Sequence, residues 1–145
     1  MERLQEISSY YHLMAETDAL YQIIQKKSGL SFAEIWVLAA IRIDGLSYQH
    51  EIARSYGINR QTVNSALRHL SEKGLAFLES EKDNQKVKKV ILTEKGISFA
   101  EKYIDTMVNL ENKAWLALSE EERSLLVSAT EHFNKVFRKE IGGES

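Results

Sequence analysis

The stretch GINRQTVNSALRHLSEKG, at residues 57–74, is a helix-forming segment bounded by a glycine at each end. Its apolar residues recur at steps of three and four, which predicts a helix with one buried face. These apolar residues are Val63, Ala66, Leu67 and Leu70. Asn59 is a suitable N-cap and Gly74 a suitable terminator, so both ends of the helix are specified locally.

The opposite face of this helix carries side chains that donate or accept hydrogen bonds. They are Arg60, Gln61, Asn64, Ser65 and Arg68. No acid interrupts this face before Glu72, although the chain holds 21 acidic and 19 basic residues. Arginine can bond O6 and N7 of guanine together, and Asn or Gln can do the same for N6 and N7 of adenine. The face is either an ordinary solvated helix surface or a surface that lies in a DNA groove.

The neighbouring segments place this helix in a winged helix-turn-helix. A shorter helix, YQHEIARSY, precedes it and ends at Gly57, with Ser47 as its expected N-cap. After Gly74, LAFLES and VKKVILT read as short strands, and the polar segment EKDNQK between them favours a turn. Two capped helices followed by a strand pair predict a winged helix-turn-helix, whose second helix enters the major groove.

The predicted DNA contacts come from this second helix and from the hairpin. The residues expected to read bases are Gln61, Asn64, Ser65 and Arg68, and those expected to hold phosphates are Arg60 and Thr62. In the hairpin, side chains alternate, so Lys86 and Lys88 fall on one side and Lys89 on the other. We expect Lys86 and Lys88 to contact phosphates or the minor groove. Lysines that protect an edge strand from aggregation are the alternative.

Helices are predicted on both sides of this centre. Residues 3–27 have amphipathic spacing, Ser31 begins a capping box that opens a second helix, Thr93 caps a long helix, and Ser119 begins a second capping box. The predicted fold is mainly α with a small β-hairpin. Its expected parts are an N-terminal dimerisation helix at residues 1–30, a winged helix-turn-helix DNA-binding domain at 31–96, and C-terminal dimerisation helices at 97–145.

Composition removes several classes of function. The chain has no cysteine, which excludes disulfides, thiolate nucleophiles and zinc sites built on thiolates. Its four histidines show no metal-binding spacing, and no catalytic triad, glycine-rich phosphate loop or carboxylate pair stands out. We therefore expect no enzyme activity, no cofactor and no metal. No apolar run is long enough to span a bilayer and the first residues do not read as a signal peptide, so we expect a cytoplasmic protein.

The charge distribution permits DNA binding by the centre of the chain. The net charge is −2, but residues 46–96 hold nine Lys and Arg against six Asp and Glu, which leaves the flanks acidic. A mildly basic centre agrees with a nucleic-acid partner without proving one.

The sequence resembles the MarR family of transcriptional regulators. The resemblance rests on LSYQHEIARSYGINRQTVNSALRHLSEKGLAFLES and on VILTEKG, in that order and spacing. It implies a homodimer whose first and last helices intertwine, and which acts on a pseudo-palindromic DNA operator, most simply as a repressor. The wing of the family usually carries Asp-x-Arg. Here Asn84 and Lys86 take those places in one register, and Asp83 and Gln85 in the other.

The resemblance also implies a small aromatic or anionic effector. The residues expected to line its pocket are Tyr10, Tyr11, His12, Trp36 and Arg42. The alternatives are that the aromatic residues pack in the core or the dimer interface, and that Arg42 pairs with Asp44 or another acid. Two other functions compete with a DNA-binding regulator: a winged-helix protein-interaction module, and a metal-responsive regulator that uses histidines and acids.

Overall fold

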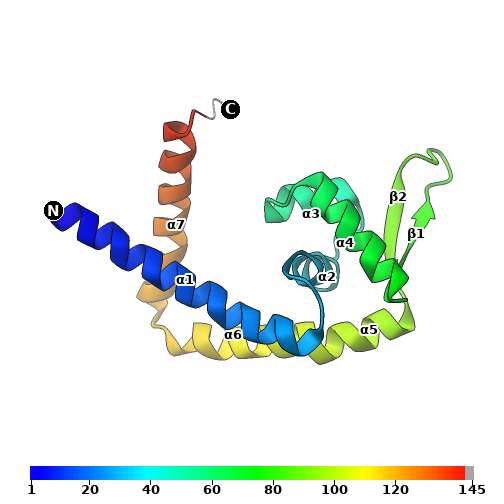
Figure 1. The fold of residues 1–145 in the computed structure, drawn as a ribbon, viewed down its shortest axis with the longest axis horizontal. Helices are drawn as coiled ribbons and strands as arrows, with labels where there is room; N and C mark the ends of the chain where they lie inside the picture. Colours follow the sequence, from blue (N-terminus) through cyan, green and yellow to red (C-terminus); the bar gives the residue numbers. More distant parts are fainter. Residues whose placement is uncertain (143–145) are drawn as a thin grey trace. The chain divides into compact units, whose positions relative to one another are not determined.

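The computed structural model describes residues 1–142 and shows a mainly helical chain with one antiparallel hairpin (Figure 1). The elements are α1 (Glu2–Ser28), α2 (Phe32–Asp44), α3 (Gln49–Tyr56), α4 (Arg60–Glu72), β1 (Ala76–Ser80), β2 (Lys88–Leu92), α5 (Glu94–Ala100), the π-helical turn η1 (Glu101–Asp105), α6 (Thr106–Ala117) and α7 (Glu120–Glu140). The predicted fold class is therefore confirmed. The chain forms two compact units, Met1–Met107 and a second unit that begins at Val108.

The core of the first unit surrounds α2. This helix buries Ile35, Val37, Leu38, Ala39 and Ala40, which agrees with its nearly continuous apolar sequence. The apolar face of α4 packs against it through Val63, Ala66, Leu67 and Leu70, as its spacing predicts. Burial of a Leu or Ile side chain stabilises a fold by about 1.5–3 kcal/mol, so this packing fixes which face of α4 turns outward.

Three of the expected helix caps are formed as predicted in the first unit. Ser31 and Glu34 make both bonds of a capping box, the Asn59 side chain accepts from Gln61 N at 2.7 Å, and Thr93 Oγ1 accepts from Gly96 N at 2.9 Å. Between α3 and α4, Gly57 has φ 60°, a left-handed conformation that favours glycine. The predicted end of α3 at Gly57 and the predicted start of α4 after Asn59 are confirmed.

The expected cap of α3 is wrong. The helix begins after Tyr48, and no side chain caps it. Ser47 Oγ instead donates to Gly45 O at 3.4 Å, while the backbone oxygen of Ser47 accepts from Val90 N at 2.7 Å. Because pairing with the wing holds this segment extended, the serine side chain is not available to the first turn of α3.

The wing is the hairpin of β1 and β2, with Leu78 opposite Val90 and Ala76 opposite Leu92. Its base is packed closely against α5. A Cβ atom on Gly96 would lie 1.8 Å from Leu75 O, so only glycine fits there. This close approach explains the glycine of the VILTEKG segment.

The helix that follows the wing contains a π-helical turn that periodicity did not predict. Glu101–Asp105 forms η1 between α5 and α6. Such turns redirect side chains and are frequent at functional positions. Here the turn ends at Asp105, whose carboxylate accepts from Arg42 of α2.

The second unit exposes a broad apolar surface. Ser119 and Glu122 form the predicted capping box at the start of α7. No residue of α7 is buried. Its exposed apolar residues include Leu125, Leu126, Phe133, Val136 and Phe137. Within residues 1–142, no helix combines the length and the apolar character that a membrane crossing requires.

Candidate nucleic-acid interface

The outward face of α4 is the centre of the candidate interface. Gln61, Asn64 and Arg68 are exposed on this face, whereas Ser65 is only half-exposed. Arg68 Nε lies 3.9 Å from Glu72 Oε1, and both side chains are about two-thirds exposed. A surface pair of this kind contributes about 0–1 kcal/mol, so Arg68 is free to turn toward a ligand.

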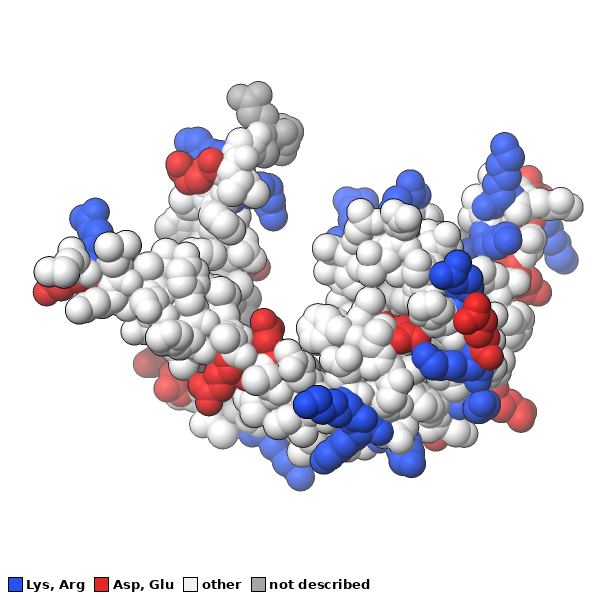
Figure 2. Space-filling model, viewed as in Figure 1, with Lys and Arg blue, Asp and Glu red and all other residues white. Residues whose placement is uncertain are grey.

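A groove separates α4 and the start of α3 from the wing. It encloses about 340 Å³. Its lining residues are Tyr48, Gln49, His50, Arg60, Asn64, Leu67, Leu78, Lys86, Val87 and Lys88. We call this feature the wing groove. It brings together four of the predicted contacts, Arg60, Asn64, Lys86 and Lys88, and its lining includes no Asp or Glu. Figure 2 shows Lys and Arg atoms at the hairpin tip and over the nearby α3–α4 region.

The two sides of the wing differ in charge. Lys86 and Lys88 line the wing groove, whereas Lys89 lies in a separate depression with Glu79, Glu81, Lys82 and Asp83. At the hairpin tip, Asn84 Oδ1 accepts from Lys86 N at 3.1 Å. The asparagine therefore shapes the backbone of the turn that carries Lys86.

Tyr48 links the wing to the helix-turn-helix. Its hydroxyl donates to Glu81 Oε1 at 2.5 Å, and its backbone forms an isolated antiparallel bridge with Lys89. The hydrogen bond to Glu81 is the main cause that raises the pKa of Tyr48, so the phenol keeps its proton as the donor. The ring of His50 stacks on that of Tyr48, with centroids 5.9 Å apart.

Sequence reasoning did not single out Tyr48, Gln49 or His50 as interface residues. These residues reach the wing groove because the segment before α3 pairs with β2. The only sequence signal was a run of polar and aromatic residues at the start of a helix, and such a run does not show which strand it will meet.

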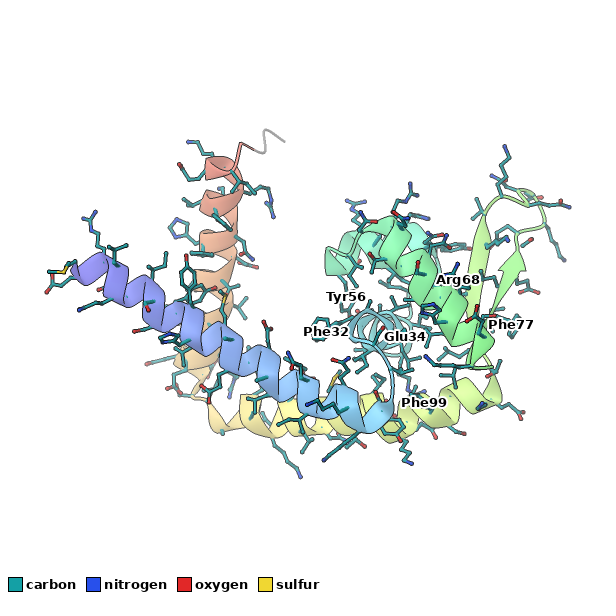
Figure 3. All side chains as sticks on the ribbon, in the orientation of Figure 1. Phe32, Glu34, Tyr56, Arg68, Phe77 and Phe99 are labelled. Atoms are coloured by element: carbon teal, nitrogen blue, oxygen red, sulfur yellow. The ribbon has the colours of Figure 1, made fainter. Side chains whose placement is uncertain are left out.

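A buried carboxylate ties the C-terminal end of α4 to the start of α2. Glu34 is 3% exposed, and its carboxylate accepts from Lys73 Nζ at 2.7 Å and from Ser31 N at 2.6 Å (Figure 3). His69 Nδ1 is 3.9 Å away. Burial raises the pKa of Glu34, but the hydrogen bonds from Lys73 and Ser31 outweigh it, so the pKa lies below its ordinary value. Glu34 is thus held ionised between α2 and the C-terminal end of α4.

The candidate effector residues do not gather at one place. Trp36 packs among Tyr21, Phe32 and Tyr56, with ring centroids 5.3, 5.9 and 6.0 Å away. Figure 3 shows Phe32 and Tyr56 near each other beside α2. A cavity of about 550 Å³ is lined by Phe32, Ala33, Trp36, Tyr56, Gly57, Ile58 and Thr62. Trp36 is the one candidate pocket residue in this lining. Thr62, a candidate phosphate contact, also lies here rather than in the wing groove.

The other four candidate residues of the effector pocket lie elsewhere in the first unit. Tyr10, Tyr11 and His12 are exposed on α1. Arg42 makes a bidentate pair with Asp105, at 3.0 Å from Nε and 2.7 Å from Nη2. The Arg42 hydrogen bond is the main cause that lowers the pKa of Asp105. The partner of Arg42 is thus an acid from η1, and Asp44 instead accepts from the Tyr56 hydroxyl.

Metal-ligating residues do not cluster in the part of the chain that the structure describes. Within residues 1–142, no group of three or more His, Asp or Glu side chains is arranged as a metal site.

Comparisons with known proteins agree with this geometry. The model of the MarR family matches residues 28–85. The MarR family regulator NMB1585 from Neisseria meningitidis has a similar structure, with a TM-score of 0.79, 18% identity and 97% of each chain covered. S. aureus MepR bound to DNA has a TM-score of 0.72 and 22% identity over 88% of this chain and 96% of MepR. S. aureus MarR in complex with salicylate and kanamycin has a TM-score of 0.73 and 18% identity over 97% of this chain and 95% of that chain. No curated protein matches this chain in sequence.

The buried face of α4, the wing and these structural likenesses define a winged helix-turn-helix protein with the fold of MarR regulators. Its winged-helix segment, residues 28–85, is similar to the model of the MarR family. The resemblance seen in the sequence is therefore confirmed.

Proposed function

We propose that this protein is a sequence-specific DNA-binding transcriptional regulator, most simply a repressor that blocks a promoter. The observation that carries the proposal is the division of α4 into two faces. Val63, Ala66, Leu67 and Leu70 are buried. Gln61, Asn64 and Arg68 project outward, and the wing groove with Lys86 and Lys88 adjoins them. These side chains can bond base edges in the major groove, while lysines hold phosphates.

We propose that it acts as a homodimer. The apolar residues of α7, and Leu4, Leu13, Leu20 and Ile23 of α1, are exposed in the single chain. On each of these helices, exposed apolar side chains of this number favour an association site. A second copy is the simplest partner, since most soluble oligomers are symmetric homodimers. Two recognition helices related by a two-fold axis would read a pseudo-palindrome with half-sites about one helical turn apart. In this arrangement, residues 1–30 and 97–145 serve dimerisation and residues 31–96 serve DNA binding.

The direct experiment is selection of bound fragments from random or genomic DNA, followed by gel shifts with the recovered sites. We expect a pseudo-palindromic consensus and a steep loss of affinity with salt, because phosphate contacts release counterions. Asn64→Ala and Arg68→Ala should each weaken operator binding by about 1–3 kcal/mol and relax one base position. Ser71→Ala, on the exposed end of the same helix, is the matched control and should bind as the wild type does.

We propose that a small aromatic or anionic effector modulates this binding. The support is the aromatic cavity beside Trp36, which adjoins Thr62 at the start of α4. S. aureus MarR, similar in fold, was solved with salicylate and kanamycin. Isothermal titration with a panel of aromatic acids, against wild type and Trp36→Leu, tests the proposal. Equal affinity for both proteins would remove Trp36 from the site.

The competing function is a winged-helix module that binds another protein rather than DNA. The acid-bearing side of the wing, with Glu79, Glu81 and Asp83, is the observation that favours it. Such a module would give no specific band in gel shifts at low salt, and DNA selection would recover no consensus.

A further inference from the structure

The lining of the wing groove includes a histidine, His50, that the proposed base reading and phosphate binding leave unused. It is the second residue of α3 and its side chain is exposed. It shares the groove lining with Arg60 from α4 and with Lys86 and Lys88 from the wing. The lining of one groove therefore includes basic residues from α3, from α4 and from the wing.

The position of the groove determines what would lie in it. If α4 occupies the major groove and the wing reaches toward the neighbouring minor groove, the strand that separates the two grooves passes between α4 and the wing. The wing groove lies between these elements. Leu67, Leu78 and Val87 supply an apolar part of its lining, against which a sugar can pack, and the basic side chains meet the phosphate.

The ring of His50 has a defined support. It stacks on Tyr48 at an interplanar angle of 30°. Tyr48 is itself fixed at two points, by its hydroxyl bond to Glu81 and by its backbone bridge to Lys89. Because the imidazole of His50 stacks on a tyrosine ring that is already held in place, it can bind a phosphate with little further loss of conformational entropy.

We propose that His50 is a proton-dependent contact to a DNA phosphate in the wing groove, so that DNA affinity is higher when its imidazole carries a proton. The inference rests on the proposed DNA binding and adds a regulation to it. A neutral imidazole can donate a single hydrogen bond, whereas the protonated ring donates from both nitrogens and carries a positive charge.

The charged groups around His50 set the sign of the effect. Arg60, Lys86 and Lys88 face the same groove. Two carboxylates act on Tyr48, whose ring stacks on His50: Glu81, which accepts from the Tyr48 hydroxyl, and Glu51 of α3. A phosphate brings new negative charge into the groove and favours the charged form of a histidine beside it. DNA binding then takes up a proton, and by linkage lower pH tightens binding.

The test is fluorescence anisotropy with a selected operator near pH 6 and near pH 8, at constant ionic strength. The variants are His50→Gln, which keeps a neutral hydrogen-bonding group, and His50→Arg, which carries a charge at both pH values. His69→Gln is the matched control, because His69 lies beside Glu34 and outside the groove lining. Circular dichroism at both pH values confirms that each variant is folded.

We expect wild type and His69→Gln to bind about twofold to fivefold more tightly near pH 6 than near pH 8. His50→Gln should bind equally at the two pH values, and His50→Arg should be equally tight at both. A pH dependence that survives in His50→Gln, or a wild type without pH dependence, would overturn the role of His50 while leaving the DNA-binding function intact. A wild type that selects no DNA sequence at either pH would overturn the proposed function, and this inference with it.

Discussion

Replacement of Glu34 by Gln should destabilise the fold by removing a charge that is buried under the recognition helix. The carboxylate accepts one hydrogen bond from the Lys73 ammonium and one from Ser31 N. Glutamine keeps the volume but has one acceptor oxygen, so its amide NH₂ must face one of these two donors. A hydrogen bond to a charged group contributes about 1.5–3 kcal/mol, and we therefore expect a loss of about 2 kcal/mol at neutral pH.

The loss of stability caused by Glu34→Gln should be larger at neutral pH than at acidic pH. The pKa of Glu34 in the folded chain lies below its ordinary value, because the Lys73 and Ser31 bonds outweigh burial. The carboxylate therefore contributes its full stabilisation above the unfolded pKa, about 4.3, and loses it as pH falls through the lower pKa of the folded state. At about pH 3 the difference between wild type and Glu34→Gln should be smaller than at pH 7.

The assay is urea unfolding at one fixed protein concentration, since association also contributes to the stability of an oligomer. Glu72→Gln is the control, because the exposed pair of Glu72 with Arg68 should contribute no more than about 0.5 kcal/mol. A Glu34→Gln protein as stable as the wild type at pH 7, or an equal deficit at pH 7 and pH 3, would refute the role given to the buried charge.

Three further predictions concern the wing, the DNA and the dimer. Gly96→Ala should destabilise the fold by about 1–3 kcal/mol, because a Cβ atom there meets Leu75 O. Ser98→Ala, at an exposed position of the same helix, should leave the stability unchanged. Thermal unfolding measures both variants. Lys86→Ala should weaken DNA binding on all sequences and reduce the salt slope by about 1, and an unchanged slope would place Lys86 away from DNA. Phe137→Glu should convert the proposed dimer to monomer in sedimentation, while Lys135→Glu on the same helix should not; equal masses for both variants would exclude this face from the interface.

Most of the helical part of this fold could be predicted because its signals are local. Asn59, Thr93 and Ser119 cap helices as expected, and the glycine after α3 takes the left-handed conformation that a helix end requires. The spacing of apolar residues in α4 identified its buried face correctly. Each of these features depends on residues no more than four positions apart, so one sequence is sufficient to read them.

The features that could not be predicted all depend on contacts between distant segments. Ser47 fails to cap α3 because Val90, far along the chain, bonds its backbone oxygen. Arg42 pairs with Asp105, the last residue of a π-helical turn that lies 63 positions along the chain. His50 was not predicted as an interface residue because its neighbours in the wing groove come from α4 and the wing. Capping rules and periodicity contain no information about such pairings.

The four candidate base-reading residues differ in their exposure and in whether they line the wing groove. Asn64 lies in the wing groove, Gln61 and Arg68 are exposed on the same helix, and Ser65 is half-covered. We therefore expect Asn64 and Arg68 to contribute more discrimination between sequences than Ser65.

The most direct test of the central claim is the affinity of wild type and Asn64→Ala for a selected operator and for random DNA at the same salt concentration. If α4 reads bases, the substitution should weaken operator binding by about 1–3 kcal/mol and leave random-DNA binding nearly unchanged. An equal loss on both DNAs, or no loss on either, would contradict a base-reading role for the outward face of α4.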